Sequence, residues 1–210
     1  SNYLPDGGWS EPVALPFFDD TMNIGTPCLS LDGNTLFFAA TNPDGYGGAD
    51  IYMSRRTESG WDAAYNAGQV INTSGNEVFP YFDSEGVMYF SSDKHPGLGG
   101  LDIFSATWKN NKFSNIKNME YPINSGADDF GLILLDKKQF INSDTLNAGY
   151  FSSNRKGGMG DDDMYFFAKT TKKLRPPVFV LKGTVLEKVY LDSLDVNSTV
   201  LDTIPLDKSI

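Results

Sequence analysis

The chain has 210 residues, and its 17 lysines and arginines against 27 aspartates and glutamates give a formal net charge of −10. Nucleic acids and anionic membrane surfaces attract clustered basic side chains, so this balance, with no basic stripe in the sequence, argues against both as partners. No apolar run is long enough to span a membrane, and Cys28, the single cysteine, excludes an internal disulfide. The 21 glycines and 11 prolines indicate many short strands joined by tight turns.

One pattern occurs three times along the chain. Two aromatic residues end a strand, a glycine-rich tip follows, and then come an aspartate, an apolar residue and an aromatic residue. The aspartates Asp50, Asp102 and Asp163 are 52 and 61 positions apart. Strand patterns repeated roughly every 40–50 residues are typical of β-propeller blades. The sequence therefore predicts an all-β fold of four-stranded antiparallel blades.

Each copy divides into three strands, and an outer strand leads to the next copy. The expected strands are 26–30, 35–40 and 50–55 in the first copy, 78–82, 87–91 and 102–107 in the second, and 130–135, 149–153 and 163–168 in the third. Gly60-Trp61 and Phe113 begin the outer strands of the first two copies. The extra residues of the third copy lie in a surface turn, 136–147, where lengthening costs little.

The opening segment predicts an incomplete ring. Gly8-Trp9 has the register of Gly60-Trp61 and is expected to be the last strand of an earlier blade. The third copy ends without an outer strand. Because propellers usually have four to eight blades, we expect the three visible blades to be part of a larger ring.

The last part of the chain predicts a second β domain. Residues 172–177 are a stiff, polar linker, and Val178–Val185 is expected to be a strand. The 33 residues from Val178 onward are too few to form a core of their own. The expected domains are therefore 1–173, the propeller blades, and 174–210, a linker with the beginning of a β-sandwich.

Two stretches resemble known families. The strings from Gly25 to Phe38, from Asn76 to Phe104, and from Asp128 to Gly131 with Tyr150 to Arg155 resemble PD40 (WD40-like) repeats of Bacteroidota OmpA-family proteins. The resemblance covers roughly residues 8–168. Leu181 to Val185 looks like the opening of a carboxypeptidase-regulatory-like domain. This domain order is similar to that of PorE-like components of the type IX secretion system.

The resemblance implies a function in the cell envelope. It implies a non-enzymatic periplasmic scaffold, associated with the outer membrane, that binds other proteins and helps to anchor a type IX secretion or gliding complex. It also implies that peptidoglycan is held by an OmpA-like domain that this chain lacks. No catalytic residue, cofactor or metal site is expected. The alternative is a carbohydrate-active or hydrolytic propeller with carboxylates converging in the central channel.

The repeated aspartates favour a structural role. A short carboxylate after a glycine tip can accept backbone N–H bonds and fix the turn. A cation site is the competing interpretation, supported by the acidic run 161–163, but no calcium-loop pattern is present. His95, the only histidine, lies in a glycine- and proline-rich tip without a nucleophile elbow, so we expect it to support the loop rather than to act in catalysis.

The three tips predict a protein-binding face. They cover residues 43–48, 95–100 and 155–160, and equivalent positions should gather on one side of the ring. Their mixture of apolar and polar side chains is typical of a protein-binding patch, although solvated loops would have the same composition. The candidate binding residues are Tyr46, His95, Leu98, Arg155, Lys156 and Met159.

Overall fold

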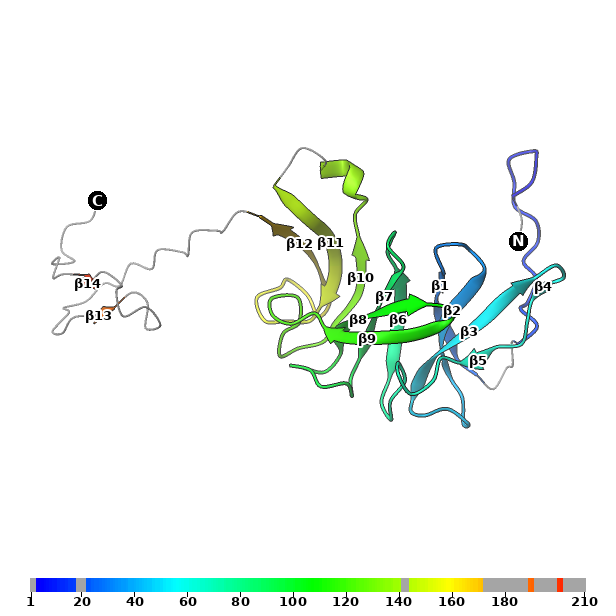
Figure 1. Ribbon diagram of the computed structural model, residues 1–210, viewed down its shortest axis with the longest axis horizontal. Coiled ribbons are helices and arrows are strands. Elements are labelled where there is room, and N and C mark those ends of the chain that lie inside the picture. Colours follow the sequence, from blue (N-terminus) through cyan, green and yellow to red (C-terminus); the bar gives the residue numbers. More distant parts are fainter. Residues whose placement is uncertain (1–2, 18–21, 141–143, 172–188, 191–199, 202–210) are drawn as a thin grey trace. The chain divides into compact units, whose positions relative to one another are not determined.

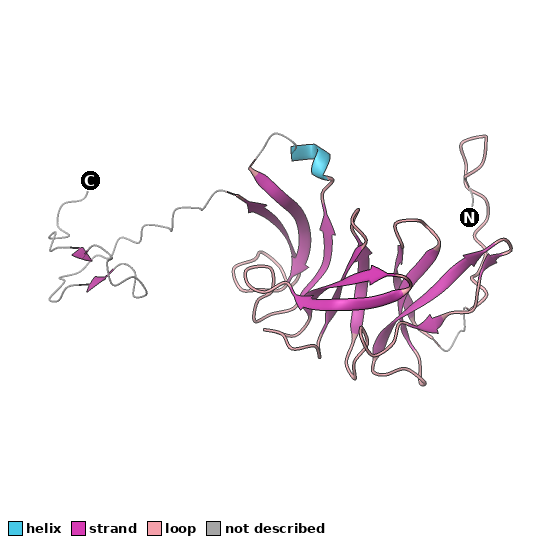
Figure 2. Ribbon diagram, in the orientation of Figure 1, coloured by secondary structure: helices cyan, strands magenta, loops and turns pink. Residues whose placement is uncertain are grey.

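The computed structural model describes residues 3–17, 22–140, 144–171, 189–190 and 200–201. The described residues form antiparallel sheets, none of them closed on itself, with one short 3₁₀ helix, η1 (Lys137–Phe140), and no α-helix. The all-β fold expected from the sequence is confirmed (Figure 2). The chain divides into two compact units, Ser1–Thr171 and Lys172–Ile210.

Three sheets follow one another along the first unit (Figure 1). In each sheet the strands pair antiparallel with their neighbours in chain order, except β5 of the first sheet, which pairs with β3. The first contains β1 (Ile24–Leu29), β2 (Thr35–Thr41), β3 (Ala49–Thr57), β4 (Gly60–Trp61) and β5 (Tyr65–Asn66), the second β6 (Glu77–Phe82), β7 (Val87–Ser92), β8 (Asp102–Lys109) and β9 (Lys112–Asn118), and the third β10 (Asp129–Leu134), β11 (Thr145–Ser153) and β12 (Asp163–Thr170).

The structure differs from the sequence expectation in three places. The outer strand of the first sheet is split into β4 and β5, which pair with different parts of β3. β11 begins at Thr145, four residues before the expected start, because its first residues pair with the end of β12. Trp9 forms an isolated bridge with Tyr3 rather than an outer strand. The predicted strand Val178–Val185 lies outside the described residues.

The second unit contributes one strand pair to the described residues. β13 (Val189–Tyr190) pairs antiparallel with β14 (Val200–Leu201). This single strand pair is fewer than the strands that the β-sandwich expected from the sequence requires.

The first strand of each of the three sheets in the first unit carries a bulge at the same place. The pairing register shifts between Gly25 and Cys28 in β1, and it shifts at the matching positions of β6 and β10. The central residue has a left-handed backbone each time, with φ of 48° at Thr26, 56° at Phe79 and 65° at Gly131. A bulge bends a strand and increases its twist. The bends place these first strands beside one another: the Phe79 N–H donates to Thr26 Oγ1 at 3.3 Å.

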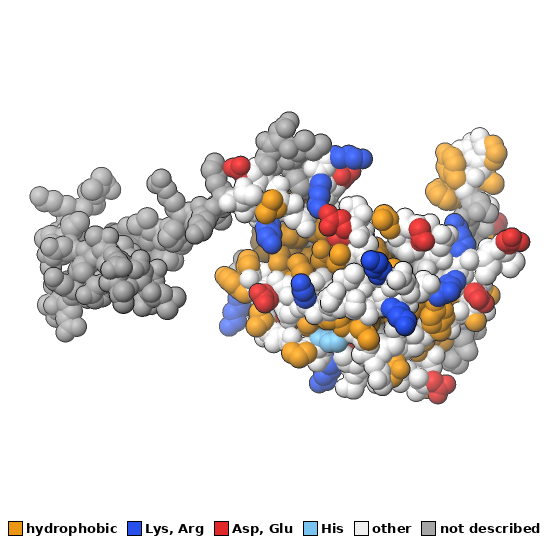
Figure 3. Space-filling model, in the orientation of Figure 1, with side chains coloured by type: hydrophobic (Ala, Val, Ile, Leu, Met, Phe, Trp, Pro, Cys, Tyr) orange, Lys and Arg blue, Asp and Glu red, His pale blue; other side chains and the backbone are white. Residues whose placement is uncertain are grey.

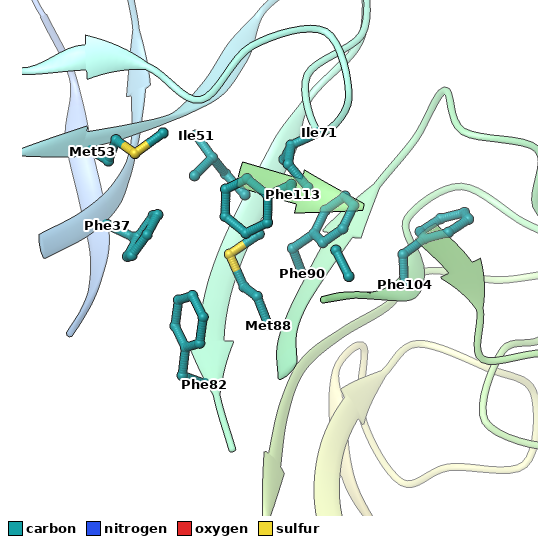
Figure 4. Close-up of a cluster of buried hydrophobic side chains, with 10 residues drawn as sticks. Phe37, Ile51, Met53, Ile71, Phe82, Met88, Phe90, Phe104 and Phe113 are labelled. Atoms are coloured by element: carbon teal, nitrogen blue, oxygen red, sulfur yellow. The ribbon is translucent and has the colours of Figure 1, made fainter. Parts of the chain in front are cut away.

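Apolar side chains fill the space between consecutive sheets. Phe37, Ile51 and Met53 of the first sheet pack against Phe82, Met88, Phe90 and Phe104 of the second (Figure 4). A separate cluster joins the second sheet to the third through Tyr89, Ile103, Leu132 and Phe151. Adjacent aromatic residues of one strand point to opposite faces. As a result, Phe37 packs against the next sheet, while Phe38 stacks on Phe17 at 5.0 Å.

Candidate functional site

The glycine-rich tips join the second and third strands of each sheet. All three lie at the same end of the first unit, along its lower edge in Figure 1, and the turns between first and second strands lie at the other end. The sheets therefore bring together three loops that are far apart in the sequence. This arrangement is the geometric basis for examining the tips as one site.

Each tip is held by the aspartate that follows it. One carboxylate oxygen of Asp102 accepts the backbone N–H groups of Leu98 and Gly99 at 2.8 and 3.0 Å. Asp163 binds Met159 and Gly160 in the same way, at 2.7 and 3.2 Å. Asp50 accepts the N–H of Tyr46 at 2.6 Å and the Asn66 side-chain amide at 2.9 Å. Asp50 and Asp102 are buried and Asp163 is half-buried, and these three carboxylates set the shape of the tips.

In the first and second sheets, the tip is hydrogen-bonded to the connecting segment that leads to the next sheet. The carbonyl of Gly75 accepts the Gly48 N–H at 2.7 Å, and the carbonyl of Ala127 accepts the Gly100 N–H at 3.3 Å. At Gly47 and Gly99 an added Cβ would overlap these same carbonyl oxygens. Glycine is required there because the backbones approach so closely.

A buried asparagine fixes each connecting segment to the preceding sheet. The side-chain amide of Asn72 makes two bonds of 2.8 Å with the N–H and C=O of Ile51. Asn124 repeats both bonds, at the same lengths, with Ile103. Both side chains are buried. The carbonyls of Ile51 and Ile103 also accept the N–H groups of Ala67 and Met119, so it is the two isoleucine N–H groups that depend on the asparagines.

One exposed apolar side chain projects from the same position of each tip. Tyr46, Leu98 and Met159 all lie four residues before the tip aspartate, and all three are exposed. Their backbone N–H groups bind the carboxylate, so the backbone is fixed while the side chains extend into solvent. Lys156 is also exposed, beside Met159 in the third tip.

His95 and Arg155 pack inward and support the loops. The His95 ring lies 5.8 and 5.2 Å from the rings of Phe90 and Phe104, and its Nε2 bonds the Ile71 carbonyl at 2.8 Å. The side chains of His95 and Arg155 are half-buried. The buried part of each supports its loop, and only the remaining exposed part is available to a partner.

Arg155 makes the matching contacts in the third sheet. Its guanidinium lies 4.9 Å from the rings of Phe151 and Tyr165 and donates to the carbonyl of Ile123. It also pairs with Asp129, whose side chain is fully buried. A buried carboxylate needs such a partner.

A polar cleft opens at the opposite end, between the second and third sheets. Its volume is about 500 Å³, within the usual range for small-molecule sites. Two lysines from the extended turn of the third sheet, Lys137 and Lys138, line it together with carboxylates, and Lys137 pairs with Glu85. The other principal lining side chains are Tyr81, Asp83, Tyr89, Asp136 and Asn147.

Burial raises the pKa of both tyrosines in this cleft. It raises the pKa of Tyr81 above its ordinary value, and burial, with the nearby Asp83 and Glu85 carboxylates, raises the pKa of Tyr89 to about 12. Tyr89 therefore keeps its proton further into alkaline solution than an ordinary tyrosine. Within the described ranges, no three His, Cys, Asp or Glu side chains are grouped so that they could hold a metal ion.

Charge is dispersed over the visible surface. On the side drawn in Figure 3, lysines and arginines lie singly among acidic and apolar side chains. In the part of the chain that the structure describes, no helix has the length and apolar character of a membrane span. The chain matches no protein-family model, and no curated protein is significantly similar to it.

Sequence reasoning missed the connecting segments. Their signal is the pair of strings Ile71-Asn72-Thr73 and Ile123-Asn124-Ser125, each followed by an acid at the start of the next strand. Glu77 and Asp129 are these acids, and they accept bonds from Thr73 and Ser125. Comparing the polar residues between copies could have found this motif.

Proposed function

We propose that the three sheets are consecutive blades of a PD40-like β-propeller in an OmpA-family periplasmic protein. The support is internal: each sheet packs its face on the next, and the first strands lie side by side with the same bulge. Sheets stacked face to face around a common axis are the propeller arrangement. The sequence strings described above support the family.

The proposed role is a non-enzymatic scaffold. It binds proteins of an outer-membrane-associated complex and helps to anchor a type IX secretion or gliding machine to the cell envelope, with peptidoglycan held by a domain outside this chain. The observation that carries this role is the shared position of Tyr46, Leu98 and Met159 on backbones held by the tip carboxylates. Rigidly presented, exposed apolar side chains are typical anchors in protein interfaces.

A pull-down from a cell-envelope fraction tests the role of the tips. The triple variant Tyr46→Ala, Leu98→Ala, Met159→Ala should lose the captured partner and keep the wild-type Tm, because only exposed atoms are removed. Leu31→Ala is the matched control, since Leu31 is also exposed but lies in a turn at the other end of the first sheet. Unchanged capture by the triple variant would show that the tips are not the binding face.

A carbohydrate-active or hydrolytic propeller is the second candidate. It is favoured by the cleft, where Asp83, Glu85 and Asp136 lie around two tyrosines. Paired carboxylates of this kind act in glycoside hydrolysis. Turnover of a glycan by the purified protein, lost in Asp83→Asn, would replace the scaffold proposal.

A further inference from the structure

The third sheet has an apolar face without a cover among the described residues. Ile133, Tyr150 and Phe166 form one row across its three strands, with the Tyr150 and Phe166 rings 5.3 Å apart. Met164 lies two residues before Phe166 on the same side of β12, because alternate residues of a strand share a face. Met164 is 75% exposed and Phe166 is 58% exposed.

The positions that match Met164 are buried in the other two sheets. Ile51 and Ile103 directly follow their tip aspartates, as Met164 follows Asp163, and both are 0% exposed. Of the residues that match Phe166, Met53 is 5% exposed and Ser105 is half-buried. In both sheets the cover is the next sheet of the chain. This face is therefore covered by the next sheet in the first and second sheets. In the third sheet no described residue covers it.

The covering sheet uses its opposite face each time. Phe90 and Phe104 of the second sheet pack toward the first, and Phe151 and Tyr165 occupy the same positions when the third sheet packs toward the second. The interface thus joins two different faces, and it is not formed by two copies of one face. This geometry defines what an occupant must supply.

The third tip also has open space where the first two tips contact a connecting segment. Gly160 stands where Gly47 and Gly99 make room for a connecting segment, although an added Cβ at Gly160 would meet only Asp163, at 3.8 Å. At the next position, Asp161 replaces Gly48 and Gly100, which lie against Asn76 and Asp128 of the following segment. A carboxylate such as that of Asp128 would be repelled by Asp161.

We propose that this face of the third sheet, formed by Ile133, Tyr150, Met164 and Phe166, is covered by a further sheet of the same repeat from the same polypeptide. The proposal rests on the propeller arrangement proposed above. The covering sheet places apolar or aromatic side chains, at the positions of Phe90 and Phe104, on Met164 and Phe166. Its connecting segment passes Gly160 and carries a neutral or basic side chain beside Asp161.

A second copy of the chain fits this face less well. The face of the first sheet that carries Phe38 and Tyr52 is the one that would have to dock, and it is already covered by Leu15 and Phe17 of its own N-terminal segment. The matching faces of the second and third sheets are used within the chain. A second copy is therefore an alternative outcome of the test.

Methionine oxidation by hydrogen peroxide tests the proposal in the complete natural protein. Met159 and Met164 lie in one tryptic peptide, 157–169, so fully exposed Met159 serves as an internal reference. Because oxidation follows exposure, Met164 should react at least roughly tenfold more slowly than Met159 in the complete protein, and at a similar rate to Met159 in the 210-residue chain. Equal rates in the complete protein would overturn the proposal, and so would protection that disappears on dilution, which would indicate a second copy.

Phe166→Ser provides an independent measurement. It should lower the Tm of the complete protein more than the Tm of the 210-residue chain, because in the shorter chain the ring loses mainly its contact with Tyr150. An equal change of Tm in both proteins would contradict the proposal. The pull-down with the tip variants does not depend on this face, so the two proposals can fail separately.

Discussion

Asn76 and Asp93 are joined by two hydrogen bonds, in which the Asn76 backbone N–H and side-chain amide donate to the two Asp93 oxygens at 2.8 and 2.7 Å. The third sheet has the same pair with the residue types exchanged. There the Asp128 N–H donates to Asn154 Oδ1, and the Asn154 amide donates to Asp128, both at 2.8 Å. The pair joins the start of one strand to the end of its neighbour, and either order satisfies it.

This exchange predicts that the pair can be reversed. Asn76→Asp alone places a carboxylate against Asp93 and should cost about 1–2 kcal/mol, because one bond is lost and two like charges approach. The double variant Asn76→Asp, Asp93→Asn reproduces the third sheet and should recover most of that loss. Urea unfolding measures both. A double variant less stable than the single variant would contradict the equivalence of the two pairs.

The tip glycines predict an unequal response to alanine. Gly99→Ala should destabilise the protein by about 1–3 kcal/mol, since its Cβ would overlap the fixed backbone of Ala127. Gly160→Ala is the matched control, because the same atom meets only Asp163, at 3.8 Å, in the described residues. Thermal unfolding of the 210-residue chain separates the two. Equal losses would show that backbone strain, and not the neighbouring segment, determines the cost.

The buried asparagines predict a loss at one backbone amide. Asn124→Ala removes the partner of the Ile103 N–H, whereas the Ile103 carbonyl keeps its bond from the Met119 N–H, and an unsatisfied buried N–H costs about 1–3 kcal/mol. Asn34→Ala is the control, because the Asn34 side-chain amide bonds an exposed carboxylate. Hydrogen exchange at the Ile103 amide should become faster in Asn124→Ala alone. Retained protection there would mean that another group replaces the asparagine.

The strands were predictable because their signals are local. Aromatic pairs, Asp-Gly turns and glycine tips place eight of the nine expected strand starts within two residues of the observed ones. The exception is β11, where the start depends on pairing with β12 across a loop that the repeat pattern does not contain. Local chemistry fixes turns, whereas distant pairing fixes strand length.

The supporting contacts were less predictable. His95 and Arg155 perform the same task but differ by one position relative to the repeat, so their equivalence follows only from their shared contacts with Ile71 and Ile123. The bulge was missed as well, since a left-handed backbone at Thr26 or Phe79 has no strong residue preference. Such features depend on the neighbouring sheet.

At position 155 we expect that lysine cannot replace arginine without a loss of stability. A lysine cannot maintain the bonds to Ser153, Ile123 and Asp129 together with the stacking on Phe151. Arg155→Lys should therefore cost about 2–4 kcal/mol, because the buried Asp129 charge loses part of its compensation. Lys156→Ala, an exposed neighbour, should change the free energy of unfolding little. Similar values for both variants would contradict the supporting role of Arg155.

Tyr89 predicts a loss of stability in alkaline solution. Burial, with Asp83 and Glu85 nearby, raises its pKa from 10.0 to about 12 in the folded protein. Between these values the unfolded chain releases the phenol proton and the folded chain keeps it, so stability falls as pH rises. Tyr89→Phe lacks this proton, and its Tm should therefore fall less steeply than the wild-type Tm above pH 10, with parallel curves from pH 7 to 9. Parallel curves above pH 10 would mean that Tyr89 titrates normally and is not held neutral by the sheets around it.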